Sequence, residues 1–112
     1  MENYKQLCVI QGLILGEENI KELEDTIKEN LDVRIKFLCE IQTNPDKDES
    51  GNNIIGTGGR NDVLFYVHDE DVMKFAVPRL KMGIRWWEDV IKYNDNAHLY
   101  PEEFIKEHPA TW

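Results

Sequence analysis

The sequence predicts a single α+β domain, in which a three-stranded sheet carries helices packed on one face and the elements follow the order β-α-β-β-α-α. Three observations support this fold class. The chain has 112 residues, a length typical of one domain. Hydrophobic residues make up 41% of it, enough for one packed core. Apolar residues recur with a period of two in some segments and 3.6 in others, so strands and helices are mixed along a single domain of residues 1–112.

The first strand is expected within residues 4–14, where the apolar run from Leu7 to Ile10 is typical of a strand that is buried on both faces. Residues 17–31 are expected to form an amphipathic helix, because apolar side chains recur there at helical spacing. This apolar stripe consists of Ile20, Leu23, Ile27 and Leu31.

Residues 33–42 alternate between apolar and polar side chains, which predicts a strand with one solvent-exposed face. Leu38 is the one apolar residue on the polar face. Residues 43–61 then form a long loop rich in turn-forming residues, and such loops are either mobile or functional. The apolar face of the strand is expected to hold Val33, Ile35, Phe37, Cys39 and Ile41.

A third strand is expected at residues 62–67, which are apolar enough to be central in the sheet. Residues 70–93 are predicted to be mostly helical, with an apolar face that includes Leu80. Pro78 and Gly83 should kink this segment or split it into two helices. A short last helix follows Tyr100-Pro101, because proline is well suited to the first position of a helix.

The charge balance is the clearest compositional feature. Twenty-two Asp and Glu residues outnumber 13 Lys and Arg, which gives a formal net charge of −9 and a pI near 4.7. Duplex nucleic acid is polyanionic, so the chain is not expected to bind nucleic acid directly. An acidic domain instead suits a basic protein surface. The alternative is that the charge serves solubility alone.

Several classes of protein are disfavoured by the sequence. No apolar run approaches the roughly 18 residues of a membrane span, and the first residues lack the features of a signal peptide, so a cytoplasmic protein is expected. Cys8 and Cys39 lie in strand-like runs and are expected to be buried thiols, not a disulfide or a metal site. No order of Ser, His, Asp or Cys indicates a catalytic nucleophile, so neither enzymatic activity nor a cofactor is expected.

Two groups of acidic residues are candidates for partner binding. Carboxylates at helical spacing can imitate a phosphate backbone and occupy a basic groove that normally holds nucleic acid. A solvated helix face is the ordinary alternative. The candidates are Glu22, Asp25 and Glu29 on the outer face of the first helix, and Asp46, Asp48 and Glu49 in the long loop.

The Gly56–Arg60 segment is the most unusual local feature. Its three glycines permit positive φ angles and let backbone N–H groups form an anion nest, which Arg60 could complete as a clamp. The segment lies between two strands, however, whereas a phosphate-binding loop precedes a helix and ends in Lys-Ser or Lys-Thr. A hairpin connection, a partner-binding loop and an anion site are all compatible with this pattern.

Two adjacent tryptophans are the second unusual feature. Neighbouring residues on a helix point about 100° apart, so Trp86 and Trp87 cannot both face the core. Trp87 is expected inside. Trp86 is expected to be partly exposed beside Arg79 and Arg85, a composition typical of binding hot spots. The alternative is that both rings cover the edge of the sheet.

An acidic cluster, the His68–Asp71 corner, lies where the third strand meets the next helix. His68 together with carboxylates could bind a divalent ion or act on a small anionic ligand, with Asp71 or His68 as ligand or base. The alternative is structural: Asp69 would cap the helix, and acidic residues would line its first turn.

The run from Gly56 to Asp71, followed by Lys74-Phe-Ala-Val-Pro-Arg-Leu and Gly83-Ile-Arg-Trp-Trp-Glu-Asp-Val, resembles small proteins carried by phages and conjugative elements of gut and oral bacteria. The resemblance covers about residues 56–105 and carries over no site residue. Small acidic proteins of such mobile genetic elements are often inhibitors of host defence nucleases, anti-CRISPR proteins among them. The likeness to anti-CRISPR proteins is one of size and charge.

These patterns favour a non-enzymatic protein-binding module that inhibits a host nucleic-acid-binding or defence protein. Its acidic residues would meet a basic protein surface, with Arg60 and Trp86 as anchors. One alternative is an anionic-ligand or metal-dependent site formed by Gly56–Arg60 and the His68–Asp71 corner. Another is a homo-oligomeric accessory protein, such as a homodimer.

Overall fold

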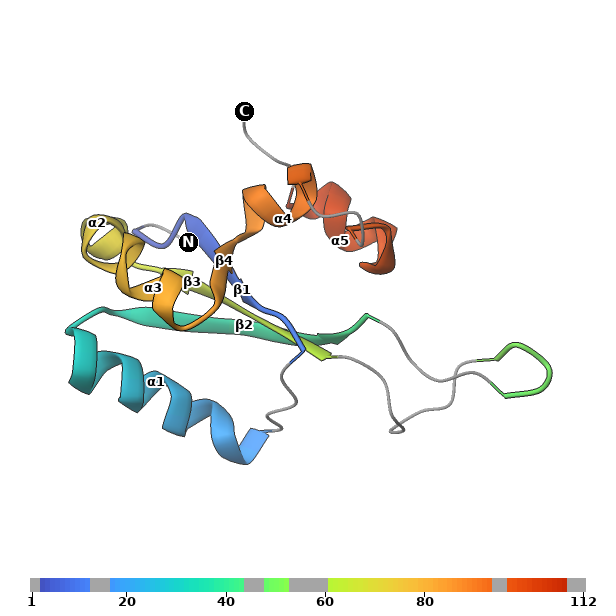
Figure 1. Ribbon diagram of the computed structural model, residues 1–112, viewed down its shortest axis with the longest axis horizontal. Coiled ribbons are helices and arrows are strands. Elements are labelled where there is room, and N and C mark those ends of the chain that lie inside the picture. Colours follow the sequence, from blue (N-terminus) through green and yellow to red (C-terminus); the bar gives the residue numbers. More distant parts are fainter. Residues whose placement is uncertain (1–2, 13–16, 44–47, 53–60, 94–96, 109–112) are drawn as a thin grey trace.

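The computed structural model describes residues 3–12, 17–43, 48–52, 61–93 and 97–108 (Figure 1). One antiparallel sheet is combined with helices, so the predicted α+β class is confirmed. The elements, with η for 3-10 helices, are β1 (Gln6–Ile10), α1 (Glu17–Leu31), β2 (Ile35–Gln42), β3 (Asn61–Val67), η1 (Asp69–Asp71), α2 (Val72–Ala76), α3 (Pro78–Lys81), β4 (Ile84–Trp86), α4 (Trp87–Tyr93), η2 (Ala97–Leu99) and α5 (Glu102–Glu107).

Four strands form one antiparallel sheet in the order β2-β3-β1-β4, where three strands were predicted. Both β1 and β2 pair antiparallel with β3, so they run parallel to each other with β3 between them. The predicted central position of the third strand is therefore confirmed. With α2 and α3 counted as one helix, the order through β4 is that of a ferredoxin-like, split β-α-β arrangement.

The fourth strand comes from a segment that was predicted to be helical. The helical segment is split at Pro78, where α3 begins, and the helical path ends at Gly83, whose φ of +72° is unfavourable for other residues. The chain then extends, and Ile84 and Trp86 pair with Ile10 and Cys8 of β1. Tertiary pairing thus overrides the helical periodicity of residues 70–93.

Helices cover both faces of the sheet, whereas the sequence predicted one covered face. Figure 1 shows α1 on one side of the sheet and α4 and α5 on the other. The core below α1 and α2 includes Ile27, Phe65 and Phe75, each at most 1% exposed. The core below α4 and α5 includes Leu64 and Trp87. Each such buried side chain contributes about 1.5–3 kcal/mol of transfer free energy.

The apolar residues of 33–42 were predicted to share one face of the strand, and a β-bulge in β2 explains why they do not. Phe37 pairs with Phe65, but Cys39 pairs with Leu64, so Leu38 is an extra residue in the ladder. Before the bulge, Ile35 packs on the α1 side. After it, Cys39 packs on the opposite side, so the predicted common face is wrong.

The two cysteines are free thiols, as predicted, although only Cys8 is fully buried and Cys39 is half-buried. Burial raises the pKa of both thiols. In the described part of the chain, no helix is both long enough and apolar enough to cross a membrane.

Candidate functional site

The outer face of α1 presents the predicted row of carboxylates to solvent. Ile27 is fully buried and fixes the rotation of the helix against the sheet. Glu22, Asp25 and Glu29 are all exposed on the helix. The Lys21 ammonium lies 4.0 Å from the Asp25 carboxylate, and both side chains are at least half exposed, so this pair contributes at most about 1 kcal/mol. The structure therefore leaves three carboxylates on a solvent-facing helix, at positions i, i+3 and i+7.

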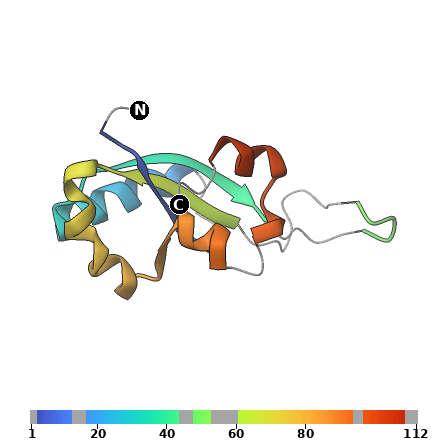
Figure 2. The same cartoon turned by 90° about the horizontal axis from the view of Figure 1, so that it is seen from above.

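The second predicted acidic group is separate from the first. Residues 48–52 lie at the far end of the molecule from α1 in both views (Figures 1 and 2). The Asp48 carboxylate accepts hydrogen bonds from the backbone N–H groups of Ser50 and Asn52, both at 2.9 Å, so it closes its own turn. Glu49 is exposed. Asp46 and the Gly56–Arg60 segment, with Arg60, lie outside the described residues.

The two tryptophans lie on opposite faces because they sit at the end of a strand, where successive side chains alternate. Trp87 is buried, as predicted, and meets Tyr100 edge to face. Trp86 is half-buried against Phe75, and the Arg79 guanidinium lies 4.5 Å over its ring. Trp86 is therefore partly exposed beside Arg79, as predicted, and its role as an anchor for a partner stays a prediction.

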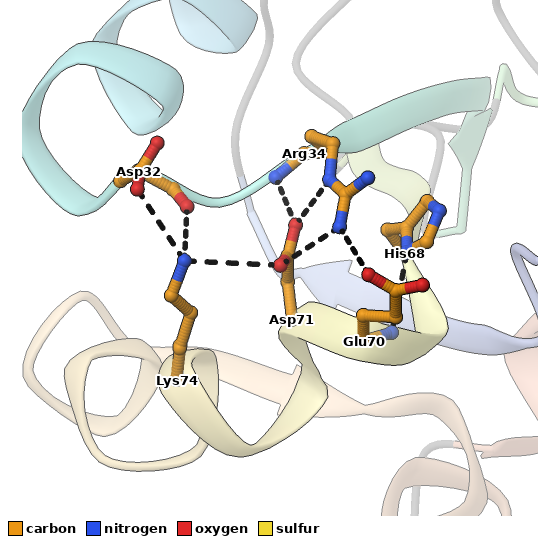
Figure 3. A network of polar contacts seen from close by, with 6 residues as sticks. All are labelled: Asp32, Arg34, His68, Glu70, Asp71 and Lys74. Atoms are coloured by element: carbon orange, nitrogen blue, oxygen red, sulfur yellow. Dashed lines mark hydrogen bonds and ion pairs between the residues drawn. The ribbon is translucent and has the colours of Figure 1, made fainter.

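The His68–Asp71 corner is tied together by Arg34, which the sequence did not single out (Figure 3). The Arg34 guanidinium donates to both oxygens of Asp71, at 2.8 and 3.2 Å, and the Arg34 backbone N–H donates at 2.9 Å. Glu70 accepts a further bond from Arg34 at 3.3 Å. Lys74 joins the Asp71 carboxylate to Asp32, at the end of α1.

These contacts set the protonation of the corner. The Arg34 guanidinium donates to Asp71 and lowers the pKa of that carboxyl from 3.8 to about 2, although burial of Asp71 acts in the opposite direction. The same hydrogen bond raises the pKa of Arg34. Asp71 is ionised at neutral pH and its two oxygens are already bonded, so the arrangement is unsuited to a general base or an open metal ligand.

The other members of the corner also have structural partners. His68 is buried, and its Nδ1 accepts from the Glu70 backbone N–H at 3.2 Å, so His68 caps η1 where Asp69 was predicted to be the cap. The Asp69 carboxylate instead accepts from the Lys5 backbone N–H at 3.0 Å. Among the residues that the structure describes, no group of three His, Cys, Asp or Glu side chains is placed to hold a metal ion.

A buried carboxylate in β3 was not anticipated. Asp62 is 1% exposed and accepts hydrogen bonds from the Gly12 backbone N–H and the Tyr100 hydroxyl. These bonds join the end of β1, the start of β3 and the segment before α5. Burying a carboxylate requires such partners, so Asp62 has a structural role.

A surface that the sequence did not predict lies on α2, α3 and β4. Leu80, which was assigned to a buried helix face, is 64% exposed, and Met73 is 83% exposed. Beside them is a cleft of about 530 Å³ between α3, β4 and α4, which Arg79 and Arg85 help to line. One signal was available in the sequence: no Asp or Glu occurs from Val72 to Trp87.

No protein-family model, curated protein sequence or solved structure matches this chain. The resemblance to small proteins of phages and conjugative elements stays a prediction. Function is therefore inferred from the chemistry of the surfaces, since one fold can serve many functions.

Proposed function

We propose that this chain is a non-enzymatic protein-binding module that presents the outer face of α1 to a basic protein surface. The observation that carries the proposal is the exposed row of Glu22, Asp25 and Glu29 on a helix whose opposite side is anchored by Ile27. A helix rises 1.5 Å per residue, so these carboxylates are spaced about 5 Å apart along its axis. Successive phosphates of one DNA strand rise about 3.4 Å, so the two charge rows have similar density.

The partner that fits this row is a groove lined by Lys and Arg, such as the nucleic-acid channel of a host defence or regulatory protein. The net charge of −9 would accelerate the encounter with such a groove and make binding weaken as salt is added. A chain that occupies the groove excludes the nucleic acid, so the proposed outcome is inhibition.

The corner site is the less supported alternative, because both Asp71 oxygens and the His68 Nδ1 are used in internal hydrogen bonds. The homo-oligomeric alternative makes a different prediction, a mass twice that of the 13.2 kDa chain in light scattering. Such a dimer, without a captured partner, would replace the proposed function.

The test compares two charge reversals of equal size. One replaces Glu22, Asp25 and Glu29 with Lys. The matched control replaces the exposed Glu102, Glu103 and Glu107 of α5 with Lys. Wild type and the control should recover the same basic, nucleic-acid-binding protein from a bacterial lysate at low salt, and the α1 variant should not.

Two outcomes contradict the proposal in different ways. If both variants lose the partner equally, the effect is one of net charge and α1 is not the binding face. If an unlabelled DNA duplex fails to compete with wild type for the recovered protein, binding stands but the nucleic-acid groove is not its target.

A further inference from the structure

The segment from Val72 to Trp87 differs in charge from the rest of the chain. It contains four Lys and Arg residues and no Asp or Glu, although the whole chain has 22 acidic residues. Lys74 is paired with Asp32 and Asp71. Among the described residues, no carboxylate forms an ion pair with the other three cations of this segment. These three are Arg79, Lys81 and Arg85.

The same segment, together with Tyr93 of α4, exposes apolar side chains. Every large apolar residue found exposed in the described part of the chain lies between Met73 and Tyr93. Contiguous exposed apolar groups mark interaction sites more often than isolated ones do. The exposed residues are Met73 at 83%, Val77 and Leu80 at 64%, Met82 at 40% and Tyr93 at 66%.

The cleft beside this surface is preorganised. Its volume of about 530 Å³ is within the usual range for binding pockets, roughly 300–1,000 Å³. Arg79 is held there by the Trp86 ring and by a 3.0 Å hydrogen bond to the Ile84 carbonyl. Its Nε is buried with no hydrogen-bond partner among the described residues. Arg85 donates to the Gln11 side chain at 3.3 Å. Asp89 is the one carboxylate found lining the cleft.

We propose that this basic and apolar surface, formed by α2, α3, β4 and the adjoining cleft, binds an acidic amphipathic segment of a partner protein. Carboxylates of that segment would meet Arg79 and Arg85, and its apolar side chains would cover Leu80 and Tyr93. The surface is separate from the carboxylates of α1 and suits a partner of the opposite charge, so this inference does not depend on the proposed function.

The shape of the surface favours a protein segment over an anionic membrane. Helices α2 and α3 have five and four residues, so neither can present the continuous apolar face with which an amphipathic helix enters a membrane surface. A preorganised cleft that two arginines help to line instead matches carboxylates held by a folded or folding peptide.

The test begins with selection of peptides from a random display library on wild-type protein. Enriched peptides should combine Asp or Glu with Leu, Phe or Trp. Binding of one such peptide, measured by fluorescence polarisation, should weaken at least about 10-fold in Leu80→Asp and in Arg85→Glu, the loss expected when a central interface residue is removed. Lys106→Glu, with the same charge change as Arg85→Glu on exposed α5, is the matched control and should bind as wild type does.

Leu80→Asp keeps the test valid if Arg85→Glu unfolds the protein, because Leu80 is largely exposed and circular dichroism would show a native spectrum. The inference is overturned if the enriched peptides are basic, if none is enriched, or if Leu80→Asp binds them normally. It is also overturned if wild type binds phosphatidylserine vesicles, and not peptides, through these residues. The Lys variant of Glu22, Asp25 and Glu29 should still bind the peptide, which separates this result from the proposed function.

Discussion

Two regions of the molecule use arginine in opposite ways. At the corner of β2 and η1, the Arg34 guanidinium donates hydrogen bonds to Asp71 and Glu70 of the same chain. On the surface of α3 and β4, Arg79 and Arg85 donate only to uncharged oxygens among the described residues. The Arg34 guanidinium is therefore paired with carboxylates of its own chain. Arg79 and Arg85 form no ion pair with a carboxylate among the described residues.

The difference separates structural from binding roles. The His68–Asp71 corner had the residue types of a catalytic or metal site, but its hydrogen bonds are satisfied internally. The α3–β4 surface had no motif, yet the Arg79 guanidinium is held in place by Trp86 and the Ile84 carbonyl, and Arg85 donates to the Gln11 side chain. A candidate site is better recognised by charges that are fixed but not neutralised than by the presence of suitable residue types.

The largest expected effect is the loss of the Asp71 carboxylate. Asp71→Ala leaves the backbone and side-chain donors of Arg34 without their partner, so it should lower the free energy of unfolding by about 2–3 kcal/mol in urea titrations. Glu70→Gln is the control. The Glu70 side chain is 78% exposed, so its change should stay within about 0.5 kcal/mol. Equal effects of the two changes would mean that the corner is not a completed structural network.

The second prediction concerns pH. The pKa of Asp71 is lowered from 3.8 to about 2 in the folded state, because Arg34 donates to the carboxylate. The stabilisation is therefore complete above the unfolded-state pKa and is lost as pH falls from about 4 towards 2. The stability difference between wild type and Asp71→Asn should be constant near neutral pH and shrink across that acidic window. A difference that does not change with pH would contradict the ionised pair.

The third prediction concerns the contact between the Arg79 guanidinium and the Trp86 ring. Arg79→Met removes the cation over the ring and the hydrogen bond to the Ile84 carbonyl, so it should cost about 1 kcal/mol. Arg79→Lys retains a cation and should cost less. Urea unfolding followed by tryptophan fluorescence measures both changes. If Arg79→Met left the free energy of unfolding unchanged, the guanidinium would not be held in place.

The smallest effect is expected on the exposed side of α3. Leu80→Asp should change the free energy of unfolding by less than about 0.5 kcal/mol, because its side chain is 64% exposed. Val77→Asp, at the same exposure, is a parallel case. A large loss of stability in either variant would mean that these side chains belong to the core. The apolar surface would then no longer be a candidate binding site.

Local sequence patterns predicted several elements closely. The helix expected at residues 17–31 is observed as Glu17–Leu31, since the apolar stripe that predicts it repeats within the helix itself. The strand expected at 62–67 is observed as Asn61–Val67. The exposure of the α1 carboxylates followed from the same stripe, because a helix that buries one side leaves the opposite side in water.

The rest depended on contacts between distant residues. Asp71 and Arg34 are separated by 37 positions, and no local pattern pairs them. The bulge at Leu38 moved Cys39 to the other face of the sheet because pairing with β3 resets the alternation.

The sequence by itself determined the fold class, the net charge and the position of the first helix, because composition and short-range periodicity are sufficient for these. Only the tertiary structure decided that Ile84–Trp86 is an edge strand, that helices cover both faces of the sheet, and that Leu80 is exposed beside Arg79 and Arg85. Strand pairing with β1 is worth more than the local helical preference of residues 84–86, and that energy appears only once the sheet has formed.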